Sequence, residues 1–102
     1  MDQNPLFTSV RNYISYLVEK QFIVKKAFIF GSYATGRQNE NSDIDLALVM
    51  DNLSNGYLMQ IELMKLSRKF DSRIEPHPFD ELDFDISNPF AKEVITKGIQ
   101  VF

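Results

Sequence analysis

A pair of aspartates in the segment Asp43-Ile44-Asp45 is the first feature that could carry chemistry. Residues i and i+2 of a strand project to the same face, so Asp43 and Asp45 would lie side by side. Two neighbouring carboxylates repel one another, and a bound divalent cation removes that repulsion. Oxygen ligands favour Mg²⁺, with Mn²⁺ as the alternative ion, over zinc. The pair therefore predicts a metal site; the alternative is a solvated turn in which the acids act as caps.

A Gly-Ser pair stands ten residues before the aspartates, at the end of an apolar run. Gly31 would let the backbone approach a ligand closely, and the turn from Ser32 to Gly36 could present amide N–H groups to an anion. The Ser32 hydroxyl adds a donor. Phosphate oxygens beside paired carboxylates, with a metal between them, describe a nucleoside triphosphate site. Taken alone, the pair is more typical of an ordinary turn after a strand.

A third carboxylate is usual in two-metal transfer of phosphoryl or nucleotidyl groups, and Glu75 is the candidate. It would act as a metal ligand or as the base for an incoming hydroxyl; the alternative is a surface residue on an edge strand. Arg73 would share its face and pair with it or contact a phosphate. His77 would share that face too, but a lone histidine between Pro76 and Pro78 is more typical of a structural or surface position.

Hydrophobic periodicity predicts the elements that must position these residues. We expect helices over 6–20, 57–70 and 89–97, and strands over 27–30, 43–50, 72–79 and 99–102. The connection between the first two strands is too short for a parallel crossover of normal length. Pro76 and Pro78 place the later half of the third strand at a sheet edge or beyond the ladder. The prediction is an α+β fold with a mixed β-sheet flanked by helices.

Composition narrows the class of protein. The chain has 102 residues, of which 44% are hydrophobic and 25% charged, and we expect one domain over residues 1–102. The absence of cysteine excludes disulfides and thiolate metal sites. No apolar run has the length of a membrane span, so we expect a cytoplasmic protein without a membrane partner. A net charge of −3 argues against a dedicated nucleic-acid binder.

The combination of Gly-Ser, ten residues, Asp-x-Asp and a later strand carboxylate resembles the DNA polymerase β-like nucleotidyltransferase superfamily. Within it, the chain is similar to a minimal nucleotidyltransferase (MNT) domain over nearly its whole length. The resemblance implies the polymerase β-like fold, with Asp43, Asp45 and Glu75 as catalytic residues that bind two Mg²⁺ ions. Gly31 and Ser32 would hold the β- and γ-phosphates of ATP or another nucleoside triphosphate. An acceptor hydroxyl would attack the α-phosphorus, and pyrophosphate would leave.

Two positions depart from the family pattern. Some relatives carry Asp as the third acid, where this chain has Glu75. Many relatives carry Arg at the position of Thr35. Arg37 is the candidate that would replace the missing phosphate contact, and a solvated loop is the alternative for it.

With 102 residues, we expect no acceptor-holding domain of the kind found in aminoglycoside nucleotidyltransferases or tRNA-tailing enzymes. The resemblance therefore implies Mg²⁺-dependent transfer of a nucleoside monophosphate, AMP from ATP, to a hydroxyl of a partner protein. That partner would be a helical HEPN-type toxin, with this chain as the antitoxin of the pair. The alternative is a non-catalytic binding module that neutralises a HEPN-type partner by docking. The short chain and acidic balance count against transfer to a small molecule or nucleic acid.

Overall fold

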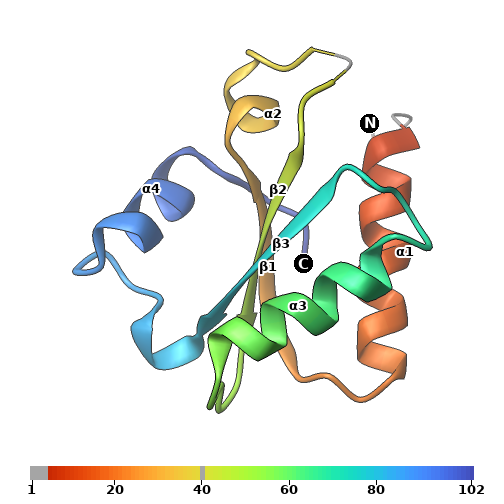
Figure 1. Cartoon of the computed structure of the whole chain (residues 1–102). Coiled ribbons are helices and arrows are strands. Elements are labelled where there is room, and N and C mark those ends of the chain that lie inside the picture. Colours follow the sequence, from red (N-terminus) through yellow and green to blue (C-terminus); the bar gives the residue numbers. More distant parts are fainter. Residues whose placement is uncertain (1–4, 40) are drawn as a thin grey trace.

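The computed structural model describes residues 5–39 and 41–102, which form a four-stranded sheet with helices on both faces (Figure 1). The helices are α1 (Pro5–Glu19), α2 (Ser32–Thr35), α3 (Gly56–Ser67) and α4 (Pro89–Lys97), with a single 3₁₀ turn, η1, at Glu81–Asp83. The strands are β1 (Val24–Phe30), β2 (Ile44–Met50), β3 (Ile74–Asp80) and β4 (Ile99–Gln100). Within these residues, no helix has both the length and the apolar character needed to cross a membrane.

The sheet is mixed, as the sequence predicts. Its strand order is β3-β2-β1-β4. β1 runs antiparallel to both β2 and β4, whereas β2 and β3 are parallel and are joined through α3. A parallel pair needs such a long crossover, and the helix supplies it. The α+β fold class is therefore confirmed.

Strand β2 has apolar residues on both faces because helices cover both faces of the sheet. On one face, Leu46 and Leu48 pack with Leu17 of α1 and Leu63 of α3. On the other face, Ala47 and Val49 join Phe28, Phe79 and two residues of α4, Ala91 and Val94. Figure 1 shows α1 and α3 on one side of the sheet and α4 on the opposite side. The continuous apolar run of β2 is thus the pattern of a doubly covered strand.

A buried phenol ties the two helices of the first face together. The Tyr13 hydroxyl of α1 donates a hydrogen bond of 2.8 Å to the Leu63 carbonyl oxygen of α3. Burial raises the pKa of Tyr13, because the charged phenolate would lose its hydration. The hydroxyl is therefore satisfied in its neutral form inside the core.

Asn88 and Gly98 cap the two ends of the C-terminal helix α4. The Asn88 side chain accepts hydrogen bonds from the N–H groups of Phe90 and Ala91, at 3.0 and 3.3 Å. The Gly98 N–H then donates to the Val94 carbonyl oxygen. A Cβ at Gly98 would lie 3.1 Å from the Ile29 carbonyl oxygen, so glycine allows the chain to pass directly into β4.

Element bounds differ from the predictions where local polar contacts compete with periodicity. β1 begins at Val24 rather than at residue 27, because exposed Lys25 and Lys26 continue the strand. α3 ends at Ser67 rather than at residue 70, and the Ser67 hydroxyl donates to the Met64 carbonyl oxygen at 2.8 Å. The predicted edge position of the prolines is confirmed: β3 is the outer strand, and its ladder with β2 continues to Asp80.

An ion pair closes the turn between α3 and β3. The guanidinium of Arg73 donates to both carboxylate oxygens of Asp71, at 3.0 and 2.8 Å, and the Arg73 backbone N–H donates at 3.0 Å. Hydrogen bonds from Arg73 hold the pKa of Asp71 below its usual range. The pair fixes the entry of the chain into β3.

Replacing this carboxylate should destabilise the protein in a pH-dependent way. We expect Asp71→Asn to lower the free energy of unfolding by about 1 kcal/mol at neutral pH, because charge-assisted hydrogen bonds are lost and solvent screens the half-exposed arginine. The folded pKa lies below the unfolded value of about 3.9, so the contribution is present above about pH 4. It is lost as the pH falls through the folded pKa. Urea denaturation at several pH values measures the difference.

Arg73→Gln is the matched control. It should lower the free energy of unfolding by a similar amount. The double variant should be little less stable than either single variant. A stability difference between wild type and Asp71→Asn that stays constant down to pH 2 would contradict this assignment.

Candidate active site

The parallel pairing of β2 and β3 places two of the predicted acids opposite one another. Asp45 and Glu75 are direct register partners, and Phe30 of β1 is the partner of Asp45 on its other side. Both carboxylates lie on the sheet face that α4 covers, because Ala47 and Phe79 at alternate positions belong to that core. The sheet therefore brings together residues that are 30 positions apart in sequence.

His77 joins the two acids. Its Nε2 atom lies 3.2 Å from Oδ1 of Asp45 and 3.4 Å from Oε1 of Glu75. One ligand atom from each of the three residues lies within 4.8 Å of the other two. Their side chains are 26%, 40% and 23% exposed, in the order Asp45, Glu75 and His77. The cluster is accessible from solvent at one end and held by the sheet at the other.

Aromatic rings fix the orientation of the imidazole. The His77 ring packs edge-on against Phe30, with centroids 5.1 Å apart, and against Phe90 of α4 at 6.2 Å. Phe90 also contacts Phe30 and Phe79, at 5.5 and 5.1 Å. The expectation of a structural or surface histidine was thus incomplete. The alternation Glu75-Pro76-His77 already indicated a shared face, but only the register with β2 reveals the contact with Asp45.

Asp43 lies outside this three-residue cluster. It is exposed and precedes β2, which begins at Ile44, so strand alternation does not fix the direction of its side chain. Among the described residues, the group that could hold a metal comprises Asp45, Glu75 and His77. Of the two aspartates predicted to lie side by side on one strand, only Asp45 lies in the strand and in this cluster.

Gly31 links the acids to the turn that follows β1. Its backbone has φ 76° and ψ −148°, a region that only glycine adopts readily. A Cβ at this position would overlap the carboxylate of Asp45. Helix α2 starts at the next residue, and the N–H groups of Ala34 and Thr35 donate to the Gly31 carbonyl oxygen. Close approach of the turn to the acid thus depends on glycine.

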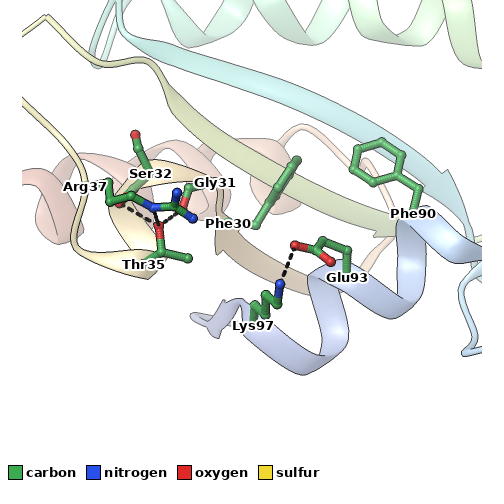
Figure 2. A pocket seen from close by; sticks show the side chains of 8 residues that line it. All are labelled: Phe30, Gly31, Ser32, Thr35, Arg37, Phe90, Glu93 and Lys97. Carbon is green, nitrogen blue, oxygen red and sulfur yellow. Dashed lines mark hydrogen bonds and ion pairs between the residues drawn. The ribbon is translucent and has the colours of Figure 1, made fainter.

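A pocket of about 370 Å³ opens between this turn and α4 (Figure 2). It is lined by Phe30, Gly31, Ser32, Thr35, Arg37, Phe90, Glu93 and Lys97. The three residues predicted to bind phosphate, Gly31, Ser32 and Arg37, therefore share one pocket. Arg37 Nε donates to the Thr35 hydroxyl at 3.4 Å, and Lys97 pairs with Glu93 at 3.2 Å. The positively charged side chains of Arg37, which follows α2, and of Lys97 in α4 therefore line the same pocket.

The residues of α4 in this pocket were missed by sequence reasoning. Phe90, Glu93 and Lys97 recur at i, i+3 and i+7, the spacing of one helix face. That spacing was readable, but the sequence does not show that this face turns toward α2. Figure 2 shows the Lys97 and Glu93 side chains paired on α4, across the pocket from the Arg37 turn.

Arg73, near the site, has a structural contact instead of the predicted one. Arg73 pairs with Asp71 and not with Glu75, and its Nη1 donates to the Tyr33 hydroxyl at 3.1 Å. Tyr33 packs against the core of the first sheet face. The expected pairing of Arg73 with Glu75 is therefore wrong, because the turn before β3 gives it a nearer carboxylate.

Comparison with known proteins identifies the family of the chain. The family model described as polymerase beta, nucleotidyltransferase, matches residues 12–102. The chain belongs to the polymerase β nucleotidyltransferase family. The resemblance to a minimal nucleotidyltransferase domain and the predicted polymerase β-like fold are thereby confirmed.

Individual relatives point to one branch of this family. The chain is 34% identical over 80 residues to the protein adenylyltransferase MntA of Shewanella oneidensis, covering 74% of this chain and 51% of MntA. It thus spans about half the length of that relative. A crystal structure described as a toxin-antitoxin with AMP-PNP is similar with a TM-score of 0.66 and 28% identity, over 89% of this chain and 71% of that one. A variant of the toxin-antitoxin MntA-HpeT gives a TM-score of 0.64 and 26% identity, over 90% and 70%.

The close approach of Gly31 to Asp45 predicts a large effect of one added methyl group. Gly31→Ala should lower the free energy of unfolding by about 1–3 kcal/mol from backbone strain, with a further loss from overlap with the carboxylate. Thermal or urea unfolding measures the change. A second substitution, Asp45→Ala, should recover the part that comes from overlap.

Gly36→Ala is the matched control, because Gly36 also has a positive φ, 75°, but a Cβ there meets no atom within 4 Å. Its free energy of unfolding should fall by a smaller amount, because only the strain of the backbone conformation contributes. Equal losses for the two glycine variants, with no recovery by Asp45→Ala, would show that Gly31 and Asp45 do not approach as described.

Proposed function

We propose that residues 1–102 act as a single metal-dependent nucleotidyltransferase domain that moves AMP from ATP to a hydroxyl group of a partner protein. The observation that carries the proposal is the position of Gly31: its backbone lies against the Asp45 carboxylate and also lines the pocket with Arg37 and Lys97. A cation at the acids and a triphosphate in the pocket would therefore be neighbours. The name of the relative MntA, a protein adenylyltransferase, supports this reading.

The donor set fits a divalent cation. Asp45 and Glu75 face each other across the ladder with oxygens close enough to share an ion. In our proposal Asp43, Asp45 and Glu75 hold Mg²⁺, with two ions in the complete site and Mn²⁺ as the alternative ion. When bound, the cation neutralises charge on the phosphoryl oxygens and lowers the pKa of the attacking hydroxyl. Asp43, which is exposed and directly precedes β2, would complete the ligand set.

The chain's own residues would orient the nucleotide. Gly31 and Ser32 would hold the β- and γ-phosphates, and Arg37 and Lys97 would contribute positive charge from two sides of the pocket. The acceptor oxygen forms a bond to the α-phosphorus while the bond from that phosphorus to the bridging oxygen breaks. Pyrophosphate carries away the electron pair. The hydroxyl proton would go to Glu75 where that carboxylate acts as the base rather than as a metal ligand.

The proposed biological role is that of an antitoxin. Two similar solved structures, at 28% and 26% identity, are described as toxin-antitoxin complexes, and one is described as containing AMP-PNP. We infer that the acceptor is a helical HEPN-type toxin and that the reaction, which consumes ATP, takes place in the cytoplasm. The competing function is neutralisation of that partner by docking alone, with the nucleotide site playing no chemical role.

Transfer of label from ATP separates these functions. Wild-type protein with Mg²⁺, the candidate toxin and ATP labelled at the α-phosphate should label the toxin, whereas label at the γ-phosphate should leave with pyrophosphate. Asp43→Asn with Asp45→Asn should reduce labelling by more than about 100-fold, because charge stabilisation at phosphorus is lost.

Asp51→Asn removes one exposed carboxylate immediately after β2, away from the site, and should leave labelling unchanged. Neutralisation of toxin by the Asn double variant, without labelling, would favour the docking function. Labelling at the wild-type rate by that double variant would show that the site lies elsewhere.

A further inference from the structure

His77 is the residue of the acid cluster for which the proposed transfer reaction gives no role. The sequence contains a single histidine, and the structure places it between the two carboxylates. Glu75 and His77 alternate along β3, so both project to the face that carries Asp45. Three different donor groups therefore converge from two adjacent strands.

The distances between the three donor atoms suit a shared cation. A nitrogen with one proton forms one strong hydrogen bond, yet Nε2 of His77 is nearly equidistant from oxygens of Asp45 and Glu75, at 3.2 and 3.4 Å. All three donor atoms fit within 4.8 Å of one another, which leaves room for one cation to contact each of them. First-row metal ions lie about 2.0–2.2 Å from nitrogen and oxygen ligands.

The surroundings hold the imidazole in position for such a contact. Phe30 and Phe90 pack against the ring from β1 and α4, so the side chain has little freedom to turn away. The ring remains 23% exposed, which leaves a route for an ion from solvent. Partial burial also strengthens the interaction between the two carboxylates and any cation placed between them.

We infer that Nε2 of His77 is a metal ligand together with Asp45 and Glu75, and that this mixed donor set makes the site prefer a first-row transition ion such as Mn²⁺ over Mg²⁺. The inference rests on the proposed function for the presence of a cation. Mg²⁺ favours oxygen ligands, whereas imidazole suits transition ions, and Mn²⁺ accepts carboxylate oxygens as well. Replacing one oxygen donor by a nitrogen thus changes which ion binds best.

Electron paramagnetic resonance of bound Mn²⁺ tests the inference directly. The full chain is titrated with Mn²⁺ alone, without nucleotide, and the bound fraction is measured from the loss of the free-ion signal. Pulsed measurements on the bound ion should show coupling to an imidazole ¹⁴N nucleus, which only His77 can supply. His77→Gln should abolish that coupling and weaken Mn²⁺ binding by at least about 10-fold.

Competition between the two ions provides the second readout. The ratio of Mn²⁺ to Mg²⁺ affinity should fall by about 10-fold in His77→Gln, because Mg²⁺ gains little from the imidazole. Asp45→Asn should weaken the binding of both ions, and Asp51→Asn should weaken the binding of neither. Thermal unfolding of each variant without metal checks that the fold is retained.

Two outcomes would overturn the inference. Mn²⁺ that binds without imidazole coupling, and with equal affinity in wild type and His77→Gln, would show that His77 only forms an ion pair with the acids. In that case, α-phosphate labelling by the wild-type protein would still stand, so the proposed function would survive. Failure of the wild type to bind Mn²⁺ or Mg²⁺ in the absence of nucleotide would overturn the three-residue metal site itself.

Discussion

The register of the parallel pair β2–β3 is the constraint on which the rest of the site depends. It sets Asp45 opposite Glu75 and Ala47 opposite His77. A slip of one residue in β3 would turn Glu75 and His77 to the other face, among the apolar side chains beneath α1 and α3. Burial of β3 on both faces opposes such a slip, because Ile74 and Phe79 fill different cores. Apolar packing on both faces of the sheet thus keeps two carboxylates and a histidine close together.

A second constraint joins this register to the pocket. Gly31 follows β1 beside Asp45 and opens the turn that lines the pocket, so one residue connects the acids to the proposed phosphate-binding residues. α4 completes both parts: its apolar face covers the sheet, Phe90 packs against His77, and Lys97 reaches the pocket. The Asn88 cap and the close packing at Gly98 therefore help to place functional side chains.

Much of this architecture could be predicted because its signals are local. The short connection between the first two strands indicated a mixed sheet, and paired prolines indicated a sheet edge. The spacing from Gly31 to Asp45 indicated two residues that the structure brings together. The contact of His77 with Asp45, the pairing of Arg73 with Asp71 and the place of Lys97 in the pocket depend on register and on the rotation of α4. Those are tertiary properties, which residue spacing alone does not determine.

Calorimetric titration with AMP-PNP tests most directly whether one compact site binds a cation and a triphosphate together. We predict that saturating Mg²⁺ raises the affinity of the wild-type protein for AMP-PNP by about 10-fold or more, a typical coupling between neighbouring sites. Asp45→Asn should lose most of that gain, whereas Asp51→Asn should keep it. An affinity that does not respond to Mg²⁺, or that responds equally in wild type and Asp45→Asn, would contradict the account.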